Sequence, residues 1–139
     1  MGTTIRPELS AKNPYWIEKH RYYELKHFCL QYPIWKKAYL ALDGLAKRPT
    51  DLVLFSGQQH LGDPTARCAE ARIFYSDRME LVKLVAEETD AVLGTYIFQA
   101  VTNGISYDCL KARLDIPCCK DVYYDLYRRF FWLLNKERG

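Results

Sequence analysis

The sequence lacks the short patterns that catalytic and metal-binding proteins commonly carry. It has no Cys-x-x-Cys pair, no His-Glu-x-x-His motif, no glycine-rich phosphate loop and no serine nucleophile motif. The five cysteines are irregularly spaced, and no acidic or cysteine partner stands at ligand spacing from His20 or His27. We therefore expect a protein that is not an enzyme and that has neither a cofactor nor a bound metal.

Long apolar runs are also absent. No stretch approaches the roughly 20 apolar residues that a membrane-spanning helix needs. Residues 1–16 lack the apolar segment of a signal peptide. Hydrophobic residues make up 49% of the 139 positions and charged residues 27%, a balance typical of a globular chain with a core. We expect a cytoplasmic protein, in a bacterial host, with no membrane partner.

Charge is distributed unevenly along the chain. Residues 1–50 carry nine Lys and Arg and four acidic residues, whereas residues 51–105 carry four basic and eight acidic residues. Residues 106–139 carry seven basic and five acidic residues, so an acidic middle separates two basic ends. Basic ends are compatible with phosphate contacts, although a net charge of +3 is equally typical of an ordinary solvated surface.

Capping residues and helical periodicity predict an all-α fold of five to six helices. Asn13-Pro14 is a helix-start signal, Pro33 interrupts the first helix, and Asp43-Gly44 is a stop signal for the second. We expect residues 44–62 to form an irregular loop, in which the four apolar residues 52–55 are too few to predict a strand.

The next helices have similar signals. Asp63-Pro64 opens a long helical stretch, Asp90 is expected to cap a further helix, and Asn103-Gly104 ends it. We divide the chain into an N-terminal helical region, residues 1–103, and a C-terminal unit, residues 104–139.

The C-terminal unit has the pattern of a helix-turn-helix, which places its second helix in the major groove of DNA. Ser106 is expected to cap the first helix, and residues 115–117 are expected to form the turn. The first helix has an apolar face of Tyr107, Leu110 and Leu114, with Ile116 buried beneath the turn. The buried side of the second helix is expected to include Val122 or Tyr123, Leu126 and Phe130.

The remaining polar side chains of this unit are candidates for contacts with double-stranded DNA. Arginine and lysine bind phosphate or guanine, and tyrosine hydroxyls bind phosphate. Asp121 and Asp125 have two interpretations, because carboxylates repel phosphate but accept hydrogen bonds from cytosine or form caps and ion pairs. A helical hairpin without DNA contacts is the structural alternative. The candidate residues are Lys111, Lys120, Tyr124, Tyr127 and Arg128.

Three segments of the chain resemble, in order, the phage late-transcription activators of the RinA and ArpU type. They are RYYELKHFCLQYPIWKKAYLAL (21–42), DPTARCAEARIFYSDRMELVKLV (63–85) and SYDCLKARLDIPCCKDVYYDLYRRFFWLL (106–134). The resemblance implies a phage or prophage protein that regulates transcription in the host, with a C-terminal domain like region 4 of sigma factors. It implies a recognition helix in which an aromatic pair and basic residues match the family's pattern, namely Lys120, Tyr123, Tyr124, Arg128 and Arg129.

Two functions from different classes follow. In the first, the recognition helix reads DNA, and the N-terminal helices supply either a homodimer interface or a contact to host RNA polymerase. In the second, the chain is a phage-encoded interaction factor, such as an anti-CRISPR inhibitor, that binds a host protein or nucleoprotein complex. The 14% aromatic content supports the second, because Tyr, Trp and Arg are enriched in binding hot spots. A tyrosine-rich core with an amphipathic rim also explains that content.

Overall fold

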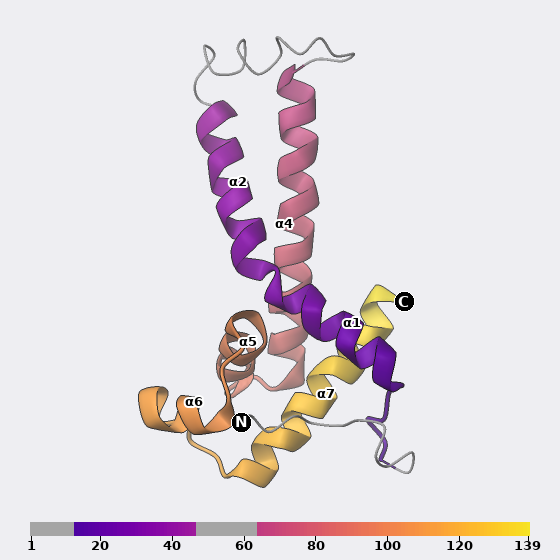
Figure 1. Ribbon diagram of the computed structural model, residues 1–139, viewed down its shortest axis with the longest axis vertical. Helices are drawn as coiled ribbons and strands as arrows, with labels where there is room; N and C mark the ends of the chain where they lie inside the picture. Colours follow the sequence, from indigo (N-terminus) through magenta and orange to yellow (C-terminus); the bar gives the residue numbers. More distant parts are fainter. Residues whose placement is uncertain (1–12, 47–63) are drawn as a thin grey trace. The chain divides into compact units, whose positions relative to one another are not determined.

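The computed structural model describes residues 13–46 and 64–139, which confirm the all-α prediction (Figure 1). The part of the expected loop at residues 47–62 lies outside this range. The described residues contain no strand, and none of their helices is long and apolar enough to cross a membrane. They form six helices: α1 (Lys19–Leu30), α2 (Tyr32–Ala46), α4 (Pro64–Thr89), α5 (Gly94–Asn103), α6 (Tyr107–Leu114) and α7 (Lys120–Arg138).

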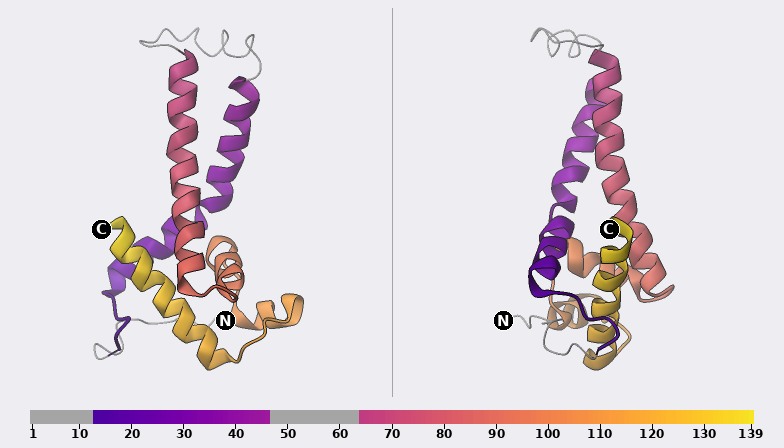
Figure 2. Two further views of the ribbon diagram at one scale, coloured as in Figure 1. Left: turned by 180° about the vertical axis from the view of Figure 1, so that it is seen from behind. Right: turned by 90° about the vertical axis from the view of Figure 1, so that its right-hand side faces the viewer.

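The chain separates into two compact units. One consists of residues 1–31 and 82–139, and the other of residues 32–81. In the first unit α1 contacts α5 and α7, and α5 also contacts α6 and α7. The two views in Figure 2 show α1 beside α7 and α6 as a short helix before α7. The functional boundary that we place between residues 103 and 104 stays a prediction.

The first helix begins later than the sequence predicts. The side-chain oxygen of Asn13 accepts a hydrogen bond from the backbone N–H of Tyr15 at 2.8 Å, so Asn13-Pro14 starts a turn rather than a helix. Helix α1 begins at Lys19, and the Glu18 carboxylate accepts from the N–H groups of His20 and Arg21. Glu18 therefore satisfies the free N–H groups of the first helical turn.

The break near Pro33 is confirmed. Helix α1 ends at Leu30, and α2 starts at Tyr32, so Pro33 lies in a first turn that does not need its missing N–H. The predicted stop at Asp43-Gly44 is two residues too early, because α2 continues to Ala46.

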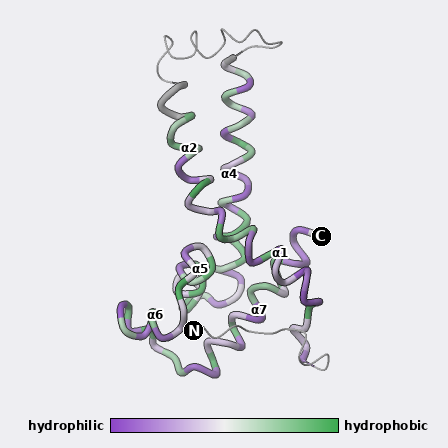
Figure 3. Tube along the Cα trace, in the orientation of Figure 1, coloured by the Kyte–Doolittle hydropathy of each residue, from purple (hydrophilic) through white to green (hydrophobic). Residues whose placement is uncertain are grey.

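The unit of residues 32–81 contains α2 and the part of α4 up to Leu81, and these two segments contact each other. The Cys68 thiol lies 3.5 Å from the carbonyl oxygen of Leu42, and the Arg72 guanidinium lies over the Tyr39 ring. Trp35 and Cys68 are buried, whereas Ile73 and Phe74 are exposed. Figure 3 shows hydrophobic and hydrophilic residues interleaved along α4, as expected for a helix with only partial cover.

The start of α4 at Pro64 is confirmed, whereas the expected role of Asp90 needs correction. The Asp90 carboxylate accepts hydrogen bonds from the N–H groups of Val92 and Leu93, at 2.8 and 2.7 Å. It therefore stabilises the turn between α4 and α5, and Leu93 is the residue that precedes α5. These two hydrogen bonds lower the pKa of Asp90 below its ordinary value.

The core of the first unit is formed where α1, α5 and α7 meet. Its side chains come mostly from these helices, which contact one another although they lie far apart in the sequence, and Leu110 and Ile116 are added by α6 and the connection after it. Aromatic rings supply much of its volume, with Phe130 and Phe131 at 4.9 Å between centroids. The largest fully buried side chains are Tyr22, Leu25, Ile97, Leu110, Ile116, Tyr123, Phe130, Phe131 and Leu134.

Candidate nucleic-acid interface

The entry into the C-terminal unit is built as the sequence predicts. Helix α5 ends at Asn103, and Gly104 follows with φ 68°, a left-handed conformation that glycine adopts without a steric penalty. Ser106 then caps α6, because its hydroxyl accepts a hydrogen bond from the N–H of Cys109 at 3.2 Å. Both ends are therefore defined by local backbone chemistry.

Helix α6 and the connection that follows it each have one buried side. Leu110 and Ile116 are fully buried, which confirms Leu110 on the apolar face of the helix and Ile116 beneath the turn. Asp115 adopts a left-handed conformation with φ 51° and turns the chain out of α6. Leu114 does not complete the apolar face as expected. It is 48% exposed, because it lies at the last residue of α6, where the chain turns away from the core.

Two side chains of α6 hold the connection of residues 115–119. The Tyr107 hydroxyl donates a hydrogen bond to the carbonyl oxygen of Cys118 at 2.7 Å. The Lys111 amine donates to the carbonyl oxygen of Ile116 at 3.2 Å and lies 3.4 Å from the Asp115 carboxylate. These contacts satisfy backbone carbonyls that have no helical partner, and they set the direction in which α7 begins.

Helix α7 starts at Lys120 and presents two different sides. Tyr123, Phe130, Phe131 and Leu134 are buried, so the predicted burial of Phe130 is confirmed, and of the two alternatives Val122 and Tyr123 it is Tyr123 that is buried. Leu126 is only half-buried, and Val122 is 45% exposed, because the side of the helix that meets α1 and α5 runs through Tyr123 and Tyr127. In the first two turns only Tyr123 is buried, and Lys120, Asp121 and Asp125 are exposed.

Three of the predicted DNA-contacting residues share one side of α7. Lys120, Tyr124 and Arg128 are spaced four residues apart, which places them one above another on a helix. Lys120 is exposed, and Tyr124 and Arg128 are half-buried. Neither Lys120 nor Arg128 forms an ion pair with another described residue.

Tyr127 faces the interior of the first unit. Its hydroxyl shares a hydrogen bond with the Tyr22 hydroxyl, with 2.9 Å between the oxygens, and its ring lies 5.0 Å from that of Phe131. Burial, reinforced by the neighbouring Tyr22, raises the pKa of Tyr127 well above the ordinary value of 10.0. The Tyr127 hydroxyl is neutral and faces inward, so its main role is to stabilise the fold and not to contact DNA.

The other two predicted residues are partly engaged by the fold. Lys111 holds the connection before α7, as described above. Arg129 donates a hydrogen bond from a terminal guanidinium nitrogen to the Tyr15 hydroxyl at 3.3 Å, and its Nε atom is buried without a hydrogen-bond partner among the described residues. Arg129 therefore connects α7 to the turn before α1, away from the side that carries Lys120.

Acidic and apolar side chains flank the basic ones. Asp121 and Asp125 are exposed on successive turns of α7, and Leu114 and Val122 are exposed on either side of the connection. The thiol of Cys118 is half-buried, and burial raises its pKa, so it is a poor nucleophile at neutral pH. No cluster of His, Cys, Asp and Glu in the described parts of the chain has the grouping of a metal site.

The pairing of Tyr22 with Tyr127 was not predicted from the sequence. Nothing in the sequence around Tyr22 identifies a partner 105 residues away. Tyr15 against Trp132, with ring centroids 5.5 Å apart, is a second contact of this kind.

No protein family, curated protein or solved structure matches the chain.

Proposed function

We propose that the protein is a DNA-binding transcriptional regulator that places the first two turns of α7 in a major groove. The observation that carries the proposal is the exposure of these two turns, with only Tyr123 buried, on a helix held at its start by α6. A recognition helix needs such an open N-terminal half, because its first residues contact the base edges. The phage origin and the RinA and ArpU relationship rest on the sequence resemblance alone.

The proposed contacts follow from which side chains share one side of α7. Lys120 and Arg128 have charges that no described residue neutralises, and Tyr124 lies between them. Arg128 and Lys120 bind phosphate or guanine, and the hydroxyl of Tyr124 binds phosphate. Lys111 supports the geometry by holding the connection, and Arg129 and Tyr127 support it from the opposite side of α7.

The test is selection of duplexes from a random library by the full-length protein, at two salt concentrations and with an unrelated duplex as competitor. We expect enrichment of one defined site, with an affinity that falls as salt rises, because each neutralised phosphate releases about 0.9 counterion. Binding without sequence preference, or no binding at the lower salt concentration, contradicts the proposal.

A protein-interaction factor is the second candidate function, and a separate observation favours it. Leu114 and Val122 are both close to half exposed, and the exposed Asp121 and Asp125 stand in the same two turns of α7 as Val122. Exposed apolar residues next to acidic ones are typical of protein interfaces rather than of DNA interfaces, which are strongly basic. Replacing Leu114, which lies at the end of α6 and outside the two turns proposed to enter the groove, by Ser distinguishes the two functions. The regulator keeps its duplex affinity in this variant, whereas an interaction factor loses its protein partner.

A further inference from the structure

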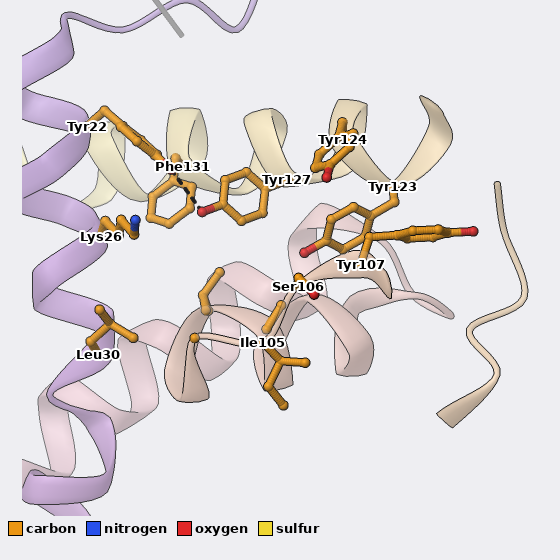
Figure 4. A pocket seen from close by; sticks show the side chains of 13 residues that line it. Tyr22, Lys26, Leu30, Ile105, Ser106, Tyr107, Tyr123, Tyr124, Tyr127 and Phe131 are labelled. Atoms are coloured by element: carbon orange, nitrogen blue, oxygen red, sulfur yellow. Dashed lines mark hydrogen bonds between the residues drawn. The ribbon is translucent and has the colours of Figure 1, made fainter. Parts of the chain in front are cut away.

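A hollow in the first unit lies between α1, the junction of α5 and α6, and α7. Its volume is about 140 Å³, and it is open to solvent on one side. Figure 4 shows Lys26 and Leu30 entering it from α1, Tyr124 and Tyr127 from α7, and Ile105 and Ser106 from the junction. The hollow borders the side of α7 that carries Lys120, because its lining includes both the inward-facing Tyr127 and Tyr124, which lies between Lys120 and Arg128 along the helix.

The size of the hollow selects a small occupant. An apolar cavity of about 150 Å³ holds one benzene molecule in a protein interior. A hollow of about 140 Å³ therefore has room for a single six-membered ring, with a substituent pointing to the open side. A nucleotide or a peptide segment is too large to be enclosed here.

The walls are aromatic. Tyr22, Tyr127 and Phe131 contact one another, with ring centroids 5.2 Å apart for Tyr22 and Phe131 and 5.0 Å apart for Tyr127 and Phe131. Their mutual contacts fix the rings before any ligand arrives. Preformed walls cost little to order, and a further ring gains from edge-to-face and stacked contacts.

The only charge in the lining of the hollow is positive. Lys26 is its only charged residue, and the Lys26 amine forms no hydrogen bond or ion pair with any described residue. The buried phenol of Tyr127 is neutral at physiological pH, because burial raises its pKa. An anionic group at the rim would therefore meet a cation and no competing carboxylate of the lining.

From these features we propose that the hollow is a binding site for a monocyclic aromatic carboxylate. The ring lies among Tyr22, Tyr127 and Phe131, and the carboxylate is held by the Lys26 amine at the open side. Because the lining also includes Ser106 and Tyr124, the occupant contacts the start of α6 and the body of α7 together. Tyr124 lines the hollow and is also a proposed DNA contact, but the proposal does not depend on DNA binding, since Lys26 and the rings of Tyr22, Tyr127 and Phe131 are not proposed to contact DNA.

The experiment is an NMR titration of the full-length protein with benzoate. We expect shift changes concentrated at Ser106, Tyr124 and Tyr127, and a higher melting temperature, because a ligand that binds only the folded state stabilises it. Acetate, which lacks the ring, and benzylamine, which reverses the charge, are the comparison compounds. Both should bind much more weakly than benzoate. Benzylamine binding as tightly as benzoate would overturn the charge argument.

Two variants test the assignment of residues. Lys26→Gln keeps most of the side chain and removes the charge, and it should weaken benzoate binding roughly fivefold. Lys19→Gln is the matched control, since Lys19 is exposed on the same helix and does not line the hollow. Leu30→Phe adds volume from a half-exposed position and should reduce binding without unfolding the protein.

Two outcomes refute the proposal. One is the absence of shift changes at the lining residues with benzoate, and the other is an equal effect of Lys19→Gln and Lys26→Gln on benzoate binding. Either result leaves the duplex experiment unaffected.

Discussion

The hydroxyl groups of Tyr22 and Tyr127 share a hydrogen bond, with 2.9 Å between their oxygens, and this bond joins α1 to α7 across 105 positions of the sequence. The Tyr22 ring also meets that of Phe131 edge to face. The contact fixes how α7 is rotated about its own axis. It therefore decides which residues of α7 remain at the surface, and Lys120 and Arg128 lie on that outer part.

Replacing Tyr127 by Phe should lower stability and leave duplex affinity unchanged. The ring contact with Phe131 is kept, and only the hydrogen bond to Tyr22 is lost, so we expect about 1 kcal/mol less free energy of unfolding. Urea denaturation of both proteins measures the difference. A drop in duplex affinity, with the folded structure intact, would mean that this hydroxyl contacts DNA.

The buried phenol of Tyr127 also predicts an alkaline limit to stability. Its folded-state pKa lies well above 10.0, whereas in the unfolded chain it titrates near that value. As the pH rises, the unfolded state therefore loses this proton first. The contribution of Tyr127 to stability is fully present below pH 10.0 and is lost as the pH rises above that value. Burial raises the pKa of Tyr123 in the same direction, so Tyr127→Phe should reduce this loss rather than abolish it. Denaturation curves on either side of this pH measure the effect, and an identical loss in the variant contradicts it.

Replacing Lys120 and Arg128 by Gln should weaken binding to the selected duplex and flatten its salt dependence. If both residues contact phosphate, the slope of log affinity against log salt should become smaller in magnitude by about 1.8. The control is Lys19→Gln with Lys83→Gln, which removes the same charge from exposed positions on other helices. Equal losses in both double variants would indicate a general charge effect and no specific contact by α7.

Gly94→Ala should destabilise the first unit. A Cβ atom on Gly94 would overlap the carbonyl oxygen of Ala86, which is backbone and cannot move aside as a flexible side chain would. We expect a loss of about 1–3 kcal/mol in the free energy of unfolding. Thr95→Ala, at the exposed neighbouring position, is the control and should change stability by less than about 0.5 kcal/mol. A neutral Gly94→Ala variant would mean that α4 and α5 approach less closely.

Asp90→Ala should cost about 1 kcal/mol at neutral pH, because it removes the side-chain acceptor for the N–H groups of Val92 and Leu93. The folded-state pKa of Asp90 is depressed below 3.8, so its contribution is present above that pH and is lost as the pH falls through the folded value. The variant should therefore lose less stability than the parent protein on acidification. Urea midpoints of both proteins at neutral and acidic pH provide the comparison. An equal loss of stability in both proteins on acidification would contradict the role given to the Asp90 carboxylate.

Helix boundaries were predictable wherever a single residue controls the local backbone. Pro64 starts α4, Gly104 follows α5, and Ser106 caps α6 as expected, because proline geometry, a left-handed glycine and a side-chain cap act within a few residues. Asn13 shows the limit of such signals. Its side chain stabilises a turn as readily as a helix start, and the turn formed.

The candidate DNA-contacting residues were less predictable, because α7 has aromatic or basic residues on nearly every side. Periodicity predicted Phe130 as buried and left Val122 and Tyr123 as alternatives. It did not separate Tyr127, which faces inward, from Tyr124, which lies next to Lys120 along the helix. Leu126, expected inside, is half-buried. A tyrosine fits either environment, since its ring is apolar and its hydroxyl is polar.

By itself, the sequence determined that this chain is helical and where several helices begin and end, because those properties depend on residues close together in the chain. Only the tertiary structure decided which side of α7 is buried and that a tyrosine-lined hollow lies beside Lys26. The reason is physical. Burial of α7 depends on α1 and α5, and their distances to it are set by packing and not by the order of residues in any one helix.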